Sequence, residues 1–274
     1  MKLVNTAIAR MGTRGAQRAL GWATVVCLAA TAVLGLVVVP PDANQGDVQR
    51  LMYVHVPAAW LAFASFGVVF VASLAYVRTG QIRWDRMAVS SAEIGVQFCA
   101  LTIVLGSLWG RPVWGAWWTW DPRLTTTAVL LLIYVGYLSL RRVADSPSRR
   151  AHWSAVVGVV GFLDVPIVHM SVVWWRSLHQ EATVLRPGAP TMAGSMLATL
   201  LFATLAFSIA YAYLMAVRTR VGRVEDRVAG VVMTSTVPRA RAPRRQGAPE
   251  RPADDAVSPA VRPPAYAPRG GRDA

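Results

Sequence analysis

The chain has 274 residues, of which 54% are hydrophobic and only 15% are charged. A soluble domain carries about 25% charged residues, so this composition excludes an ordinary soluble enzyme. The net charge of +14 would suit a DNA-binding protein, but such a protein lacks repeated apolar runs of about 20 residues. The two cysteines, Cys27 and Cys99, form no CxxC or CxxCH motif, which excludes a c-type cytochrome and a thiol redox site. We therefore expect a polytopic membrane protein with basic flanks and no nucleic-acid partner.

Six apolar stretches are long enough to cross a bilayer, whose core of about 30 Å needs about 20 helical residues. We expect an all-α fold with six transmembrane helices near residues 21–39, 58–77, 88–108, 124–140, 153–174 and 191–217. The fourth stretch is short and the last is long, so the ends of both are the least sharply defined.

Lysine and arginine residues predict the orientation of these helices. Apart from the C-terminal tail, 11 of them lie in the N-terminal segment and in the connections after the second and fourth helices. The other three connections, 40–57, 109–123 and 175–190, hold five. The positive-inside rule then places both termini in the cytoplasm and these three connections outside.

The chain is expected to divide into three parts. Residues 1–20 form a cytoplasmic N-terminal segment, 21–217 the six-helix membrane domain, and 218–274 a basic, proline-rich cytoplasmic tail. From about residue 232 the tail contains eight of the 17 prolines and almost no large apolar side chains. Such a segment cannot bury a core, so we expect it to be disordered.

Tryptophans concentrate in the outer connections. Five of the 11 lie within residues 109–120, and Trp174 and Trp175 open the last outer connection. An aromatic belt at the headgroup level is one interpretation, although a belt populates both membrane faces. The other is a flat apolar platform for a large aromatic ligand, formed by the broad rings of Trp117, Trp118 and Trp120.

Two of the four histidines accompany these tryptophans. His55 lies in the first outer connection and His179 in the third. Two imidazoles from separate loops could bind a six-coordinate haem iron from both sides of the ring, although a lone loop histidine is usually only a polar residue. Arg50 and Arg123 are the arginines best placed to pair with the two haem propionates, unless they are ordinary flanking charges.

Ionisable residues also occur inside the expected spans. His169 lies in the fifth span, where it is either a hydrogen-bonded interior histidine or part of a route for a ligand or a proton. On the simplest interpretation, the carboxyl groups of Asp164 and Glu93 are either uncharged or paired with another group inside the helix bundle. Pro166 is expected to kink the fifth span because it lacks an amide hydrogen.

Three segments together resemble a known family. The string WGAWWTWDPRLT at residues 114–125 resembles the tryptophan-rich WWD signature of haem-handling membrane proteins. MYVHVPAAW at 52–60, VPIVHMSVVWW at 165–175 and LHQ at 178–180 narrow the match. Through these motifs the chain resembles the haem exporter protein C family, CcmC, over about residues 15–220.

The resemblance implies a role in cytochrome c maturation without enzymatic activity. Such proteins hold haem b at the outer face of the inner membrane and deliver it to the haem chaperone CcmE, beside the ATP-binding-cassette components CcmA and CcmB and the small protein CcmD. His55 and His179 then correspond to the axial iron ligands. The haem and chaperone platform corresponds to Trp114, Trp117, Trp118, Trp120 and Asp121. The long tail and Asp164 depart from the family pattern.

Two alternatives remain open. A haem lyase of the same WWD superfamily would attach haem to apocytochrome, but those proteins are larger and have more histidines. A small-solute or proton transporter would use Asp164, Glu93 and His169, and it would line several spans with polar residues at helical spacing. The sequence has only these three isolated residues and no evident inverted repeat.

The charge asymmetry predicts which connections face outward. In a background lacking Cys27 and Cys99, we expect a cysteine at position 116 to react with an impermeant maleimide added from outside. A cysteine at position 146 should stay unlabelled, because it lies on the arginine-rich side. The reverse labelling pattern would show that the orientation is opposite to the predicted one, and it would contradict a haem site at the outer face.

Overall fold

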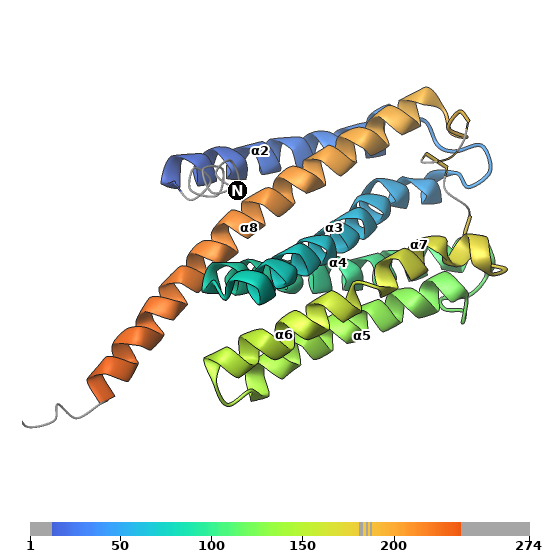
Figure 1. Ribbon diagram of the computed structural model, residues 1–274. Helices are drawn as coiled ribbons and strands as arrows, with labels where there is room; N and C mark the ends of the chain where they lie inside the picture. The colour runs from blue at the N-terminus through green and yellow to red at the C-terminus, as the bar shows by residue number, and fades with distance from the viewer. Residues whose placement is uncertain (1–12, 181–182, 185, 187, 237–274) are drawn as a thin grey trace, which may run out of the picture. The chain divides into compact units, whose positions relative to one another are not determined.

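A computed structural model describes residues 13–180, 183–184, 186 and 188–236, with side chains described up to Val228. Within these residues the secondary structure is helical, apart from one isolated bridge between Asp42 and Gly46. The α-helices are α2 (Arg14–Val33), α3 (Met52–Thr79), α4 (Ile82–Trp114), α5 (Pro122–Val143), α6 (Pro147–Gly161), α7 (Asp164–Trp174) and α8 (Gly194–Thr236) (Figure 1). A π-helical turn η1 (Leu34–Val38) follows α2, and a 3-10 turn η2 (Asp47–Leu51) precedes α3.

The six expected spans are confirmed. The helical segments long and apolar enough to cross a membrane are Arg14–Val38, Asp47–Thr79, Ile82–Trp114, Pro122–Val143, Pro147–Trp174 and Gly194–Val228. Because successive spans alternate in direction, the connections 39–46, 115–121 and 175–193 lie at one end of the helices. The short turns 80–81 and 144–146 lie at the other end (Figure 1).

Several helices extend further than the hydropathy pattern predicts. Helix α4 continues through Trp114 and ends at Gly115, whose φ of 77° suits glycine and whose amide donates to the Arg111 carbonyl at 3.0 Å. The segment expected as an outer loop at 109–123 is therefore non-helical only from 115 to 121. His55 likewise lies inside α3 rather than in a connection, because η2 runs directly into that helix.

The fifth span is interrupted, as Pro166 predicts. Helix α6 ends at Gly161 and α7 begins at Asp164. Pro166 has no amide hydrogen for the Phe162 carbonyl four residues earlier, and that carbonyl instead accepts from the Val165 amide at 3.1 Å. The resulting short turn separates the span into two helices with different neighbours.

Helices α3 and α4 form the tightly packed centre. The Phe66 ring of α3 stacks on Tyr134 of α5, with ring centroids 3.7 Å apart. The close approach of α4 depends on small residues such as Ala92, which is fully buried, and Gly95. Small residues stabilise membrane helix pairs because they let backbones approach and increase van der Waals contact.

Two ion pairs, one buried and one partly buried, join helices at the end of the bundle opposite the tryptophan-rich segment. Arg141 donates to both carboxylate oxygens of Asp85, at 2.6 and 2.8 Å. Arg218 of α8 donates to both oxygens of Glu93 on α4. Glu93 is thus paired, and α8 continues past the expected boundary at residue 217 to Thr236. The expectation of disorder in the tail falls mostly on residues 237–274, outside the described part of the chain.

Gly95 offers a test of the α3–α4 packing. A Cβ atom there would lie 2.7 Å from Phe66 Cε1 and 2.8 Å from Ser65 Cβ. Because both neighbours are fully buried, we expect Gly95→Val to lower the free energy of unfolding by about 1–3 kcal/mol. Thermal unfolding in detergent measures the change.

Gly136 of α5 is the matched control, since no atom would lie within 4 Å of a Cβ atom at this position. Equal melting temperatures for Gly95→Val and Gly136→Val would contradict the packing argument.

Candidate functional site

The carboxylate of Asp121 connects two segments that are distant in sequence and lie at the same end of the helices. Its Oδ1 accepts from the Arg123 amide at 2.9 Å and caps the N-terminus of α5, where Pro122 is the first residue. Its Oδ2 accepts from the Leu178 amide at 2.7 Å. Asp121 is buried, so both bonds are shielded from water. The segment that carries His179 is thereby held against the start of α5.

Arg123 extends this connection toward the histidines. Its Nη2 donates to the backbone carbonyl of His169 at 3.0 Å, and its Nη1 lies 3.3 Å from Nδ1 of His179. The Arg123 Nε is buried without a hydrogen-bond partner in the described part of the protein. A cationic group therefore lies between α5, α7 and the segment after α7, with one donor left for another acceptor.

His179 is partly buried beside Trp114, with ring centroids 6.1 Å apart in an edge arrangement. Burial and the nearby Arg123 guanidinium lower the pKa of the His179 imidazole below its ordinary value. The ring is therefore neutral at pH 7 and keeps a nitrogen lone pair. Its Nδ1 also lies 3.2 Å from the Gln180 carbonyl, which can accept a hydrogen bond from that nitrogen.

His55 approaches from α3. Its ring meets Trp109 edge-on at 5.7 Å, and Gly106 of α4 leaves the space it occupies, since a Cβ atom there would lie 3.2 Å from His55 Cε1. Nδ1 of His55 is buried, and no described residue forms a hydrogen bond with it. A buried nitrogen without a partner is unusual and is available to a ligand.

These side chains surround one cavity of about 540 Å³. Its volume is within the range of small-molecule and cofactor sites. The residues predicted from sequence that line it are His55, Trp114, Trp118, Arg123 and His179. His169, whose role the sequence left open, lines it too. Apolar side chains of α3, α4, α5 and α7 form most of the remaining wall.

Other predicted residues lie elsewhere. Trp117 and Trp120 do not line the cavity and are 57% and 81% exposed, and Trp120 meets Trp118 edge-on. Arg50 pairs with Asp47 and donates to the carbonyls of Gly35 and Val39. It therefore holds the end of the first span against η2 and does not line the cavity.

Sequence analysis missed Trp109 and Gln45, which line the cavity together. The Trp109 Nε1 donates to Gln45 Oε1 at 2.8 Å. Trp109 belonged to the tryptophan-rich segment and could have been selected from it. Nothing in the local sequence of Gln45 predicted this bond, since the two residues meet only when α4 packs beside the first outer connection.

The chemistry of the cavity suits an iron centre that brings its own ring of ligands. Among the described residues, no group of three or more histidine, cysteine, aspartate or glutamate side chains could hold a bare metal ion. The cavity instead brings two imidazoles, those of His55 and His179, to one aromatic and apolar wall.

Known proteins resemble this chain over most of its length. The family model for heme exporter protein C matches residues 2–233. The chain belongs to the heme exporter protein C family, CcmC. It is 40% identical to the Heme exporter protein C of Bradyrhizobium diazoefficiens over 201 residues, 71% of this chain and 74% of the relative.

More distant relatives bear related names. The Heme exporter protein C of Haemophilus influenzae is 35% identical over 204 residues, 74% of this chain and 82% of the relative. A putative cytochrome c biosynthesis ccmC-like mitochondrial protein of Arabidopsis thaliana is 35% identical over 155 residues, 57% of this chain and 58% of the relative.

Asp121 offers a test of how the His179 segment is held. In Asp121→Asn, one oxygen can still cap α5, but the amide NH2 would face the Leu178 amide, and two donors cannot bond. We expect the free energy of unfolding to fall by about 1–3 kcal/mol and the Leu178 amide to exchange faster, as measured by hydrogen–deuterium exchange.

Asp47→Asn is the matched control, because the Asp47 side chain is 78% exposed and only pairs with Arg50. An unchanged exchange rate at Leu178 in Asp121→Asn would show that other contacts hold the segment.

Proposed function

We propose that this protein binds haem b at the outer face of the inner, cytoplasmic membrane and delivers it to the haem chaperone CcmE during cytochrome c maturation. The observation that carries the proposal is the convergence of His55 and His179 on one aromatic cavity. His55 lies in α3 and His179 follows α7, where the hydrogen bond from the Leu178 amide to Asp121 holds the segment in place. The role is binding and transfer, with no covalent chemistry on the haem.

The two imidazoles supply the axial bonds to the iron. A metal-binding histidine usually donates its other ring N–H to a carbonyl, which fixes the tautomer. The Gln180 carbonyl, 3.2 Å from His179 Nδ1, supports this role. With the proton on Nδ1, the His179 Nε2 keeps its lone pair for iron. His55 has a buried Nδ1 that no described residue uses.

The ring and its two propionates need different surroundings. The apolar and aromatic wall, including Trp114 and Trp118, suits the porphyrin. Arg123 is the outer arginine that lines the cavity and has an unpartnered Nε, so we assign it to a propionate. Arg50 is committed to backbone carbonyls, and we assign it to the fold instead.

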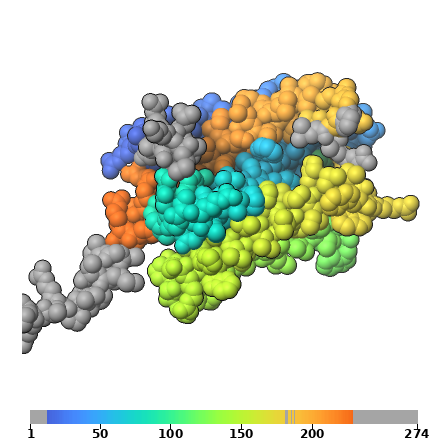
Figure 2. Space-filling view, in the orientation of Figure 1, coloured from blue at the N-terminus to red at the C-terminus, as the bar shows by residue number. Residues whose placement is uncertain are grey.

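Delivery requires an outer surface that a partner can reach. Trp117, Trp120, Trp174, Trp175 and Leu178 are all at least half exposed. Figure 2 shows residues at the end of α7, in yellow, on the surface at this end of the helices. An exposed apolar patch of this kind is typical of a protein-binding site. We assign it to CcmE, with CcmA, CcmB and CcmD as further components of the system.

Transfer then proceeds by ligand exchange. The His179 segment is held by the hydrogen bond that the Leu178 amide donates to Asp121 Oδ2. Docking of the chaperone on Leu178 and its neighbours disturbs this bond and weakens the bond between His179 and iron. The acceptor then takes the iron, while His55 on the firmly packed α3 is the last ligand to leave.

The axial ligands are tested by absorption spectroscopy of the haem-loaded protein. Wild type should give a six-coordinate, low-spin spectrum. In His55→Ala and in His179→Ala, most molecules should lose the six-coordinate, low-spin spectrum, because one of the two axial bonds to iron is missing. Glycine variants with added imidazole should recover part of it, since the cavity remains.

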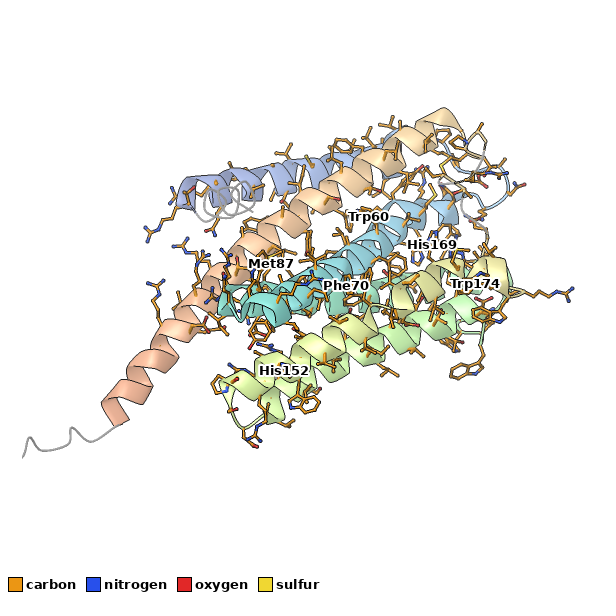
Figure 3. All side chains as sticks on the ribbon, in the orientation of Figure 1. Trp60, Phe70, Met87, His152, His169 and Trp174 are labelled. Carbon is orange, nitrogen blue, oxygen red and sulfur yellow. The ribbon has the colours of Figure 1, made fainter. Side chains whose placement is uncertain are left out.

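His152→Ala is the control, because His152 lies at the opposite end of the helices from Trp174 (Figure 3). A spectrum that survives both His55→Ala and His179→Ala but is lost in His169→Ala would overturn the ligand assignment and keep haem binding. A wild-type protein that binds no haem would overturn the function itself.

A further inference from the structure

The interruption of the fifth span gives its two halves different neighbours. Helix α6 packs against both α3 and α5, whereas α7 packs against α5, and no comparable packing joins α7 to α3 in the described residues. The span is therefore closed against α3 in its inner half and separated from it in its outer half. The cavity occupies the outer half, between these two helices.

The side of the cavity between α3 and α7 is open. On α3, Val56 and Trp60 line it and are 37% and 48% exposed. On α7, His169 lines it and is also exposed, while its neighbour Val168 is buried. Trp60 is kept at this rim by a hydrogen bond from its Nε1 to Ser208 Oγ on α8, at 3.4 Å.

This opening lies at the depth of the hydrocarbon layer. Both helices belong to apolar spans. At a rise of about 1.5 Å per residue, Trp60 is about 12 Å below the outer end of α3, and His169 is about 8 Å below Trp174 at the end of α7. The exposed residues at the rim thus lie within apolar helices of membrane-spanning length and not in the connections between them.

An exposed imidazole is costly at this depth and is usually retained for a function. The structure records no hydrogen bond to the His169 side chain from the described residues. Its backbone carbonyl accepts from Arg123 Nη2, and Nη1 of the same guanidinium contacts His179. The backbone of His169 and the ring of His179, a proposed axial ligand, therefore both contact the Arg123 guanidinium. The position of His169 in α7 can be followed in Figure 3.

Given the haem-binding function proposed above, we propose that haem enters the cavity sideways from the hydrocarbon of the outer leaflet, between α3 and α7. His169 binds the iron at the opening, and the haem then moves inward. The bond between iron and the His169 nitrogen breaks as the bond to the His179 nitrogen forms, with no change in oxidation state. The porphyrin passes between apolar side chains, and the propionates follow toward Arg123.

The first test blocks the opening in protein that is already folded. Val56→Cys, in a background with Cys27→Ala and Cys99→Ala, is purified, placed in nanodiscs and reacted with a bulky maleimide. Haemin is offered either from lipid vesicles or bound to albumin in water, and the rate of appearance of the low-spin spectrum is measured. We expect the maleimide to slow loading from vesicles by at least about tenfold relative to loading from albumin.

Val54→Cys is the matched control. Val54 is also 37% exposed and lies two residues away on α3, but it does not line the cavity. The same label there should leave the ratio of the two rates unchanged. Equal slowing of both routes by the label at position 56, or no slowing of either, would overturn lateral entry.

The second test concerns His169. His169→Ala should slow loading from vesicles while the final spectrum still shows two axial histidines, and His152→Ala should load like wild type. Wild-type loading rates from vesicles in His169→Ala would remove this residue from the route. These results differ from failure of the proposed function, in which the unlabelled protein would bind no haemin from either source.

Discussion

The site depends on one carboxylate. Asp121 accepts a hydrogen bond from the first turn of α5 and another from the Leu178 amide. The first bond fixes where α5 begins, because an aspartate at the N-cap position followed by proline at the first helical position is a strong signal for the start of a helix. The second holds a segment without regular structure over the cavity. Without it, His179 would belong to a long, weakly held connection.

The helices supply the rigid part of the same site. His55 lies on α3, which packs closely on α4 through small residues, and Gly106 leaves room for its ring. One proposed ligand is therefore fixed by packing and the other by a hydrogen bond at the neighbouring Leu178 amide. This asymmetry suits the haem transfer proposed above, since the weaker support can yield first.

The charged residues of the spans are divided between the two halves of the molecule. In the inner half they are paired, Asp85 with Arg141 and Glu93 with Arg218. Each pair neutralises two charges, whereas Asp164 of α7 forms no ion pair with the described residues, and its Oδ2 is buried without a hydrogen-bond partner. The outer half retains Arg123 and the histidines around the cavity, where unpaired donors and acceptors serve a ligand.

The sequence by itself determined the fold class and predicted several of the residues that line the cavity. Apolar runs of membrane length predicted six spans, and Pro166 predicted the interruption of the fifth, since both features depend only on local hydropathy and backbone chemistry. The WWD motif and the two outer histidines also indicated where a haem would bind. Hydropathy could not locate the ends of α4 and α8, because polar residues continue a helix once its backbone bonds are satisfied.

Tertiary structure alone decided which of the candidate side chains meet. Arg50 and Arg123 are both outer arginines, yet Arg50 binds carbonyls of the first span, and Arg123 lines the cavity. Trp118 lines the cavity and Trp120 is exposed, although they lie two residues apart. The opening between α3 and α7 depends on how the two halves of one span pack. Such choices follow from contacts between residues distant in the chain, which no local pattern encodes.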